Sequence, residues 1–581
     1  MSLIFNKPKQ PHKPVATTFG SRRIGLLGFI MCSMVLLIVR AVDLQVVNKQ
    51  FLQTQGAKRH ISVVPVATYR GKIFDRDGEV MAISSPVQSV WVNPQELDAT
   101  QKAKLKQMIA LLELPKDKIK VLANPDPKQR FVYLKRRISP ELAEKVKLLQ
   151  ISGIYFEREF KRFYPAGPMA AHIVGFTNAD DLGQEGMERA FEENLAGTAG
   201  SKRVIRDGKR RIIEDVENIK EPVPGQDLTL SIDRRIQYLA YRELQAAFIA
   251  HQAKSASLVV LNAKTGEILA AVTQPAFNPN SRKNLTENVY RNRAITDVYE
   301  PGSSVKPFVV AAALDRNYIP ENAKFISDGA IQIGRNLVKD GHNYGVLDLA
   351  GVLKKSSNIG AAQISLKMPS HYFWNVYNQL GFGTSPGTGF PGEASGSLLS
   401  VNRVHGFSQA ALSFGYGLSV STLQLARAYT ALADNGVLHS LSLLKRDHDV
   451  DAKRIFKKST AKKVRKMMEQ VIEVDGTAYE ARVDGYRVAG KTGTVRKATH
   501  GGYSDKKYFA VFAGMAPASN PRFVIVVMID EPSEEQYYGG LVSAPIFSKV
   551  MTGALRIYGV ESDGDNTVPI LLTKKNIHEA E

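Results

Sequence analysis

The chain has 581 residues, of which 44% are hydrophobic and 23% charged, with a formal net charge of +21, which is the composition of a globular protein of about two to four domains. The chain has no nucleic-acid motif, so the basic excess favours contact with an anionic envelope or membrane surface over contact with nucleic acid. A basic face that is simply solvated is the alternative. The single cysteine, Cys32, excludes a disulfide within the chain, and the histidines lack metal-ligand spacing, so we expect no metal and no cofactor.

The first apolar segment predicts a membrane anchor. Residues 24–39 read IGLLGFIMCSMVLLIV without a charge, and snorkelling of Arg40 extends them to the roughly 20 residues that a membrane span needs. Residues 1–23 carry basic residues and no acid, so the positive-inside rule keeps them in the cytoplasm. We expect a cytoplasmic tail, an uncleaved anchor at 24–43 and the remaining chain outside; a cleaved signal peptide is the alternative, but no A-x-A site follows.

The chain after the anchor divides into three parts. Residues 44–222 mix short strands, Lys-rich helical stretches and many Gly/Pro turns. Residues 221–233 read as a linker that leads into a strand and then a helix. Residues 223–560 have longer and more regular apolar segments, and 561–581 look like a flexible tail.

Alternating and apolar runs in the large region predict an α+β fold. Residues 257–262 and 267–272 read as a hairpin, and 508–517 and 522–530 as two more strands. The stretch STLQLARAYTALADNG predicts a helix that begins at a capping box of Ser421 and Gln424 and is stopped by Gly436. Hairpins and long apolar helices together predict an antiparallel sheet packed between helices.

The stretch EPGSSVKPFVVAAAL, residues 300–314, predicts a buried helix with a polar entrance. Ser303 and Lys306 are spaced i, i+3, which places them on one face where unpaired backbone N–H groups gather. A hydroxyl, an amine and amide donors together could form an activated nucleophile, whereas a helix cap beside a surface lysine is the alternative. The same S-x-x-K spacing recurs at Ser442/Lys445, Ser459/Lys462 and Ser504/Lys507, so the pattern alone is weak.

Two further stretches supply the polar groups that a serine–lysine site needs. KKSSNIG places Ser356 and Asn358 after a short helical segment, and YRVAGKTGTVRK places Lys491 to Thr494 in a strand-like run. K-T-G also occurs at Lys264–Gly266, where it reads as a hairpin turn. The order Ser-x-x-Lys, Ser-x-Asn, Lys-Thr-Gly is the signature of penicillin-recognising serine enzymes.

With these motifs in order, the chain resembles the class B penicillin-binding proteins of the division-specific type, from the anchor to about residue 550. RGKIFDRDGEVMA (70–82) and RFYPAGPMAAHIVGFTNADDLGQEGMERAFEENLAG (162–197) resemble the family's two pedestal motifs. RNRAITDVYEPGSSVKP, SFGYGLSVSTLQLARAY, RVAGKTGTVRK and YFAVFAGMAPASNPRF resemble its transpeptidase core. The resemblance implies an elongated mixed α/β pedestal domain at 44–222 and a serine β-lactamase-like transpeptidase domain at 223–560.

The resemblance also implies a role for each motif residue. Ser303 would be acylated by the penultimate D-alanine of a stem pentapeptide, and Lys306 would accept its proton, although which lysine acts as the base stays open. Ser356, held by Asn358 and Lys491, would pass a proton to the leaving amine. The residues expected to hold the substrate are Thr492, Gly493 and Thr494, with the N–H groups of Ser303 and Thr494 forming an oxyanion hole.

The implied function is cross-linking of septal peptidoglycan, and β-lactams would be inhibitors. Implied partners are D-Ala-D-Ala stem peptides, an acceptor amine, a membrane-embedded septal glycan polymerase and other division proteins. The implied location is the bacterial inner membrane at the division site, with the bulk of the chain in the periplasm. An elongation-type relative and a non-catalytic β-lactam sensor or division scaffold are the alternatives.

Charged residues in the pedestal motifs could suggest a second site. We interpret them instead as buried or interdomain salt bridges that position the two domains. They are Arg70, Asp75, Arg76, Arg162, Glu185 and Glu188.

Overall fold

The computed structural model describes residues 20–51, 61–98, 100–124, 126, 128–206, 212–281, 286–446, 451–499, 502–533 and 536–564. The chain forms two compact units, one of Met1–Ala67 with Ala199–Val223 and one of Thr68–Thr198 with Pro224–Glu581. The division cuts across the predicted pedestal at 44–222, because residues 68–198 are compact with the transpeptidase region rather than with the remainder of the pedestal.

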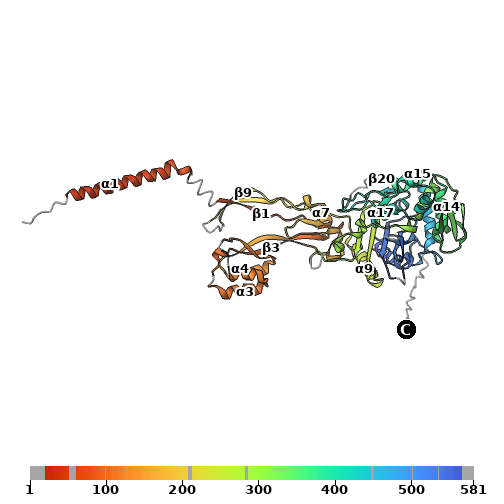
Figure 1. The fold of residues 1–581 in the computed structure, drawn as a ribbon, viewed down its shortest axis with the longest axis horizontal. Helices are drawn as coiled ribbons and strands as arrows, with labels where there is room; N and C mark the ends of the chain where they lie inside the picture. Colours follow the sequence, from red (N-terminus) through yellow and green to blue (C-terminus); the bar gives the residue numbers. More distant parts are fainter. Residues whose placement is uncertain are drawn as a thin grey trace, which may run out of the picture. The chain divides into compact units, whose positions relative to one another are not determined.

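The first unit contains the predicted anchor and a small sheet. Helix α1 (Gly20–Val42) continues into a π-helical turn at Asp43–Val47, and this segment is long and apolar enough to cross a membrane, with a mean hydropathy of 2.3 over an 18-residue window. Strands β1 (Ile61–Val66), β8 (Gly200–Arg206) and β9 (Ile212–Lys220) form an antiparallel sheet in the order β1-β8-β9 (Figure 1). Most of the predicted cytoplasmic tail, residues 1–19, lies outside the described residues.

The second unit begins with a mixed α/β region. Its sheet has the order β10-β2-β3-β4, and β5 pairs with β3. Three helices, α3, α4 and α5, contribute to a separate core around Met108, Leu112 and Leu134, all at most 3% exposed. The elements are β2 (Ile73–Phe74), β3 (Val80–Val92), α3 (Lys102–Leu112), α4 (Lys116–Ala123), β4 (Val132–Ile138), α5 (Pro140–Lys147), β5 (Ile154–Phe163), α6 (Ala171–Val174), β6 (Phe176–Thr177), β7 (Gly183–Glu185), α7 (Gly186–Ala190), α8 (Glu192–Leu195) and β10 (Leu228–Thr229), with 3₁₀ turns at Pro94–Glu96 and Gly167–Met169.

Four of the six charged pedestal residues form salt bridges, as we interpreted from the sequence; they are Arg70, Arg76, Arg162 and Glu188. Glu188 is fully buried and accepts from Arg70 Nη2 at 2.8 Å and from Arg162 Nε at 2.6 Å. Arg76 pairs with Glu267 at 3.5 Å, and Asp75 accepts the backbone N–H of Arg234, so both join the pedestal motif to the transpeptidase region.

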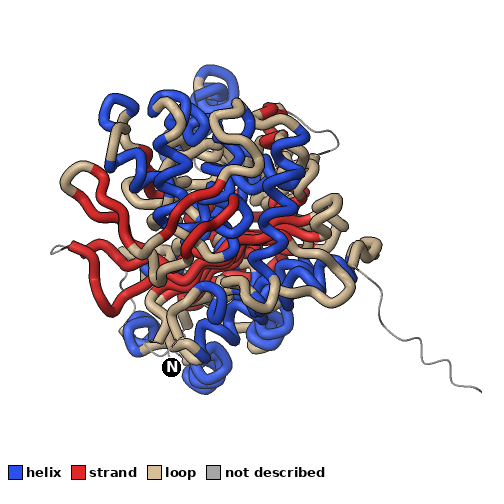
Figure 2. The backbone as a smooth tube through the Cα atoms, turned by 90° about the vertical axis from the view of Figure 1, so that its right-hand side faces the viewer, coloured by secondary structure: helices blue, strands red, loops and turns tan. Residues whose placement is uncertain are grey.

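A five-stranded antiparallel sheet in the order β12-β11-β23-β22-β21 forms the centre of the transpeptidase region. The strands are β11 (Ser255–Asn262), β12 (Ile268–Gln274), β21 (Ala489–Thr499), β22 (Gly502–Ala516) and β23 (Phe523–Asp530). Both predicted hairpins are therefore confirmed, although β22 begins at Gly502, earlier than predicted. Helices cover both faces of the sheet (Figure 2), which confirms the predicted α+β architecture.

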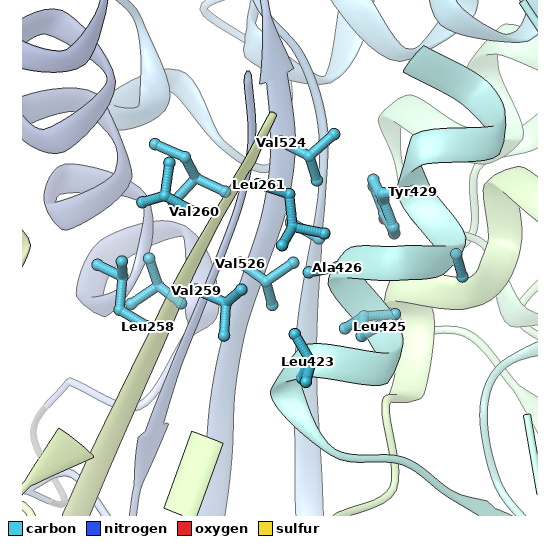
Figure 3. Packing of buried hydrophobic residues seen from close by; sticks show 14 of the residues in the cluster. Leu258, Val259, Val260, Leu261, Leu423, Leu425, Ala426, Tyr429, Val524 and Val526 are labelled. Atoms are coloured by element: carbon cyan, nitrogen blue, oxygen red, sulfur yellow. The ribbon is translucent and has the colours of Figure 1, made fainter. Parts of the chain in front are cut away.

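Three long helices pack on this sheet. Helices α9 (Arg234–Ala250) and α20 (Ala544–Ile557) pack together and contact the strands, and α17 (Thr422–Ala433) packs on β11 and β23. The predicted capping box of Ser421 and Gln424 is present at the start of α17. Figure 3 shows Leu423 and Ala426 of α17 packed beside Val526 of β23.

Shorter elements complete the region around helix α12 (Lys306–Asp315), which is almost wholly buried, as its apolar sequence predicted. They are α10 (Glu287–Tyr290), α11 (Arg293–Thr296), β13 (Lys324–Ser327), β14 (Ala330–Ile333), β15 (Asn336–Lys339), β16 (Gly345–Asp348), α13 (Leu349–Lys354), α14 (Asn358–Leu366), α15 (Ser370–Gln379), β17 (Ser397–Leu398), α16 (Phe407–Ser413), β18 (Leu418–Ser419), β19 (Val437–His439), β20 (Ala452–Arg454), α18 (Lys458–Glu469) and α19 (Gly539–Val542), with 3₁₀ turns at Gly302–Val305, Val401–Arg403, Gln470–Ile472 and Tyr479–Ala481.

The predicted flexible tail at 561–581 is wrong for its first residues. Asp563 accepts hydrogen bonds from the backbone N–H groups of Arg487 at 2.8 Å and Ser519 at 2.9 Å, and Gly564 N–H donates to Gly485 O. The polar ESDG sequence suggested a loose end, but its carboxylate caps backbone donors of the fold. Residues 565–581 lie outside the described residues.

Replacing Glu188 by alanine should strongly destabilise the second unit. Two buried guanidinium groups, Arg70 and Arg162, would lose their main anion, and breaking a buried pair in this way costs about 3 to 5 kcal/mol. Urea unfolding of the detergent-solubilised chain measures this loss. The control is Glu321→Ala, which breaks an exposed pair with Lys463 and should cost less than about 1 kcal/mol. Equal effects of the two variants would contradict the interpretation.

Candidate active site

Ser303 lies in the 3₁₀ turn Gly302–Val305 that leads directly into α12. Gly302 has φ +56°, and a Cβ added there would lie 2.3 Å from Val495 Cγ2, so the turn requires glycine. Gly415 packs against the same turn, since a Cβ on it would lie 2.1 Å from Gly302 O. The backbone of the turn is thus fixed, while the Ser303 side chain stays partly exposed.

Lys306 is fully buried and directed at the second motif. Its Nζ donates to Asn358 Oδ1 at 2.8 Å, to the backbone carbonyl of Ser356 and to Ser356 Oγ at 3.3 Å. Ser356 has φ +58°, a left-handed conformation that turns the chain between α13 and α14. The structure therefore brings Lys306, Ser356 and Asn358 together, although about fifty residues separate them in the sequence.

Lys491 approaches the same serine from the sheet. It lies on β21 and its Nζ donates to Ser356 Oγ at 2.9 Å and to Thr492 Oγ1 at 3.2 Å. The hydroxyl of Ser356 thus lies within hydrogen-bond distance of both lysine amines.

Burial determines the protonation of both amines. Desolvation, followed by the charge of Lys491, holds the pKa of Lys306 well below its usual value, and the carboxylate of Asp340 opposes that shift. Desolvation also lowers the pKa of Lys491 to about 7. Neutral amine is therefore accessible near neutral pH, which is what proton acceptance from a hydroxyl requires.

The third motif lies on the edge strand of the sheet, next to the turn that carries Ser303. β21 pairs only with β22 among the described strands. Gly493 closely approaches the turn, because an added Cβ would lie 2.8 Å from Pro301 O. Thr492 Oγ1 bonds to Thr477 Oγ1 at 3.1 Å, and Thr494 Oγ1 accepts from Gly539 N–H at 3.0 Å. The hydroxyl of Thr492 is thus held beside the Lys491 amine, and that of Thr494 is held by Gly539.

The three motifs therefore meet at one place, with one qualification. Within the described residues, Ser303 Oγ makes no hydrogen bond to a protein group, and Lys306 Nζ is engaged by Ser356 and Asn358 instead. The serine is joined to the other groups through the backbone of its turn. The arrangement offers an unengaged hydroxyl at the entrance of the helix that begins with Lys306, one of two desolvated amines, which suits nucleophilic catalysis.

Asp340 is a site residue that sequence reasoning missed. Its carboxylate accepts from the N–H groups of Asn358 and Ile359 at the start of α14 and from the hydroxyls of Ser357 and Ser327. It therefore holds the Ser356–Asn358 segment in place. No signal in the sequence marked it, because Asp340 stands in a polar hairpin eighteen residues before Asn358.

The repeated motifs outside the site have structural roles. Ser442 Oγ donates to Leu444 O, and Lys445 Nζ donates to Arg76 O. Ser504 Oγ accepts backbone N–H groups of a turn in β22, and Lys264–Gly266 connects β11 to β12, as predicted. Ser459 begins α18 away from the three motifs. Within the described part of the chain, no group of three or more His, Cys, Asp and Glu could hold a metal ion.

Comparison with protein families gives two matches. Residues 256–552 match the family model described as penicillin binding protein transpeptidase domain, and residues 65–230 match the penicillin-binding protein dimerisation domain.

Curated relatives match along almost their whole length. The probable peptidoglycan D,D-transpeptidase PenA of Neisseria gonorrhoeae is 41% identical over 561 residues, covering 95% of this chain and 95% of PenA. The peptidoglycan D,D-transpeptidase FtsI of Escherichia coli is 40% identical over 566 residues, covering 97% of this chain and 96% of FtsI.

Two solved structures share the fold. The transpeptidase domain of penicillin-binding protein 3 from Burkholderia pseudomallei is 41% identical, with a TM-score of 0.54, and covers 58% of this chain and 98% of that one. A peptidoglycan synthetase from Bifidobacterium adolescentis, 24% identical with a TM-score of 0.70, covers 87% of this chain and 98% of that one.

Replacing Asp340 by alanine should slow acylation of the chain by a fluorescent penicillin about 10- to 100-fold, because Ser356 and Asn358 lose their anchor and small misplacements at a site have effects of this size. Stopped-flow measurement of the acylation rate tests this. Asp328→Ala changes an exposed aspartate of the same hairpin region and serves as the control. An unchanged rate in Asp340→Ala would show that the anchor is dispensable.

Proposed function

This chain belongs to the class B penicillin-binding protein transpeptidases, division-type, and we propose that it is a peptidoglycan D,D-transpeptidase that works through an acyl-enzyme on Ser303. The observation that carries the proposal is the convergence of Lys306 and Lys491 on Ser356 Oγ beside the turn of Ser303. The substrates are D-Ala-D-Ala stem peptides, and β-lactams acylate the same serine.

Acylation begins with the hydroxyl of Ser303. Its oxygen attacks the carbonyl carbon of the penultimate D-alanine, and its proton passes to a neutral lysine amine. Lys306 is our choice of base, because it begins the helix that directly follows the turn of Ser303 and because burial holds the pKa of its amine well below the usual value. Lys491 stays the alternative base, since the pKa of its amine is also lowered, to about 7.

The leaving group departs through Ser356. When the C–N bond breaks, the amine of the terminal D-alanine takes a proton through the Ser356 hydroxyl, which receives hydrogen bonds from both lysines. An acceptor amine from a second stem peptide then attacks the ester, the C–O bond to Ser303 breaks and the hydroxyl is restored. Ser356 relays the proton in both halves of the reaction.

The edge strand β21 binds the donor. Thr492 and Thr494 offer hydroxyls to the terminal carboxylate beside the cationic form of Lys491. The N–H groups of Ser303 and Thr494 form the oxyanion hole, where one donor is worth about 3 kcal/mol of transition-state stabilisation. Gly493 permits this arrangement, because a side chain there would collide with Pro301 O.

The anchor and the relatives support a proposal for the location. Helix α1 spans the inner membrane once, and the folded bulk lies in the periplasm at the division septum. A membrane-embedded septal glycan polymerase and other division proteins are its partners there. The strong basic excess, +21 over the whole chain, suits contact with an anionic envelope.

Replacing Ser303 by alanine should abolish covalent labelling by a fluorescent penicillin, read by denaturing gel fluorescence, because the attacking oxygen is removed. Ser504→Ala, which changes a serine of the same S-x-x-K spacing outside the site, should label normally. Labelling of Ser303→Ala at the wild-type level would refute the assignment. In cells, a Ser303→Ala chain that still rescued septation would favour the scaffold alternative over chemistry.

Replacing Lys491 by glutamine should move the pH dependence of acylation. Protonated Lys306 cannot accept a proton, so the rate falls as pH falls through its pKa. The charge of Lys491 lowers the pKa of Lys306, and the carboxylate of Asp340 raises it. Removing the lysine leaves the effect of Asp340, so the fall in acylation rate at low pH should begin at a higher pH. Measuring the acylation rate of both chains between pH 5 and 9 tests this. Near pH 7 we expect the rate of the Lys491→Gln variant to be at least about 10-fold lower than that of the wild-type chain. If the acylation rates of both chains fell at the same pH, Lys306 would be excluded as the titrating base.

A further inference from the structure

A pocket lies at the C-terminal end of α12, the helix that begins with Lys306. It has a volume of about 530 Å³. Its lining consists of Arg316, Tyr318, His371, Tyr372, Trp374, Asn375 and Val401. Tyr372 OH donates to Ala312 O of α12, six residues after Lys306, so the pocket begins about 9 Å further along the helix than the catalytic lysine. None of the site residues described above lines it.

Two aromatic side chains of this pocket, Tyr372 and Trp374, are held by hydrogen bonds from their polar ends. Trp374 Nε1–H donates to Leu399 O at 2.7 Å, and the Tyr372 hydroxyl donates to Ala312 O at 3.0 Å. The rings of Tyr318 and Tyr372 pack with centroids 5.2 Å apart. Because the polar atoms of Trp374 and Tyr372 are engaged by backbone carbonyls, these two partly exposed side chains contribute mainly apolar ring surface to the pocket.

The rim of the pocket is polar and carries no carboxylate. His371 and Asn375 lie one turn apart on α15, next to Arg316 from the end of α12. Within the described residues, the His371 ring, the Asn375 amide and the Tyr318 hydroxyl make no hydrogen bond to another protein group. Apolar ring surface with a rim of donors suits a ligand that has one apolar face and polar edges.

We propose that this pocket, made by Tyr318, Tyr372 and Trp374 with the rim of Arg316, His371 and Asn375, binds a saccharide segment of the glycan strand. A pyranose ring presents C–H bonds on one face and hydroxyl or N-acetyl groups at its edge. The C–H bonds can pack on the aromatic rings of the pocket, and the polar groups can accept hydrogen bonds from the side chains of the rim. A lipid chain would leave the polar rim unused. The proposal rests on the proposed function only in its choice of saccharide, because the stem peptides that reach Ser303 are carried on a glycan polymer.

The chain has two tryptophans, and this gives a direct test. In a Trp91→Phe variant, Trp374 is the one tryptophan left, so tryptophan fluorescence reports on the pocket alone. The detergent-solubilised full-length variant is titrated with chitotetraose and, separately, with peptide-free glycan strands. We expect a saturable change in emission with both probes. Tyr318→Ala should weaken binding at least 10-fold, whereas Tyr238→Ala, an exposed tyrosine on α9, should not.

The outcomes separate this proposal from the proposed function. Penicillin labelling of Ser303 should stay at the wild-type level in Tyr318→Ala, while cross-linking of polymeric glycan should show a raised KM. No saturable change with either probe, or equal binding by Tyr318→Ala and its parent, would overturn the saccharide site. Binding of protein segments but not of either glycan would identify the pocket as a protein-docking surface and would equally overturn it. Loss of penicillin labelling in the parent chain would instead count against the proposed function alone.

Discussion

The proposed active site depends on placing two lysine amines in a buried position around the hydroxyl of Ser356. Lys306 and Lys491 are both 0% exposed, and both lie within hydrogen-bond distance of Ser356 Oγ. Two unit charges about 4 Å apart repel by about 4 kcal/mol at an effective dielectric constant of about 20, and burial adds a desolvation cost. The fold therefore favours a state in which at least one amine is neutral, and a neutral amine is what a serine hydroxyl needs as its proton acceptor.

The surrounding fold supports this arrangement with rigid backbone. The turn of Ser303 is fixed by Gly302 and Gly415, which leave no room for side chains, and the edge strand β21 passes the turn at Gly493 for the same reason. Asp340 supplies the nearby negative charge and fixes the start of α14. Ser303 and Lys491 are nearly two hundred positions apart in the chain. Their segments are brought together by the contacts of Gly302 and Gly415, by the edge strand β21 and by the carboxylate of Asp340.

Much of this could be predicted from the sequence, because local signals were strong. The apolar run after Lys306 predicted α12, alternating residues predicted the hairpins, and Ser421 with Gln424 predicted the start of α17. The order of three motifs singled out Ser303 from three decoys of equal spacing. The catalytic roles of the residues in the three motifs stay a prediction.

Other features could not be predicted, since they depend on contacts between distant segments. Asp340 sits in a hairpin without a motif, and its partners follow from tertiary packing alone. The docking of Asp563 on Arg487 and Ser519 likewise needs the folded partners, so the polar sequence suggested a loose end. The compact grouping of residues 68–198 with the transpeptidase region reflects contacts between distant segments, such as the Gln237 amide donating to Met169 O and Arg76 pairing with Glu267, rather than any change in composition.

The most direct test of the account is to locate the bond that a β-lactam forms. Mass spectrometry of proteolytic fragments from the penicillin-treated full-length chain should place the whole adduct on Ser303, because its partly exposed hydroxyl makes no hydrogen bond to a protein group among the described residues, whereas Ser356 Oγ is engaged by both lysine amines. An adduct on Ser356, on Ser304 or on a serine outside the three motifs would contradict the account.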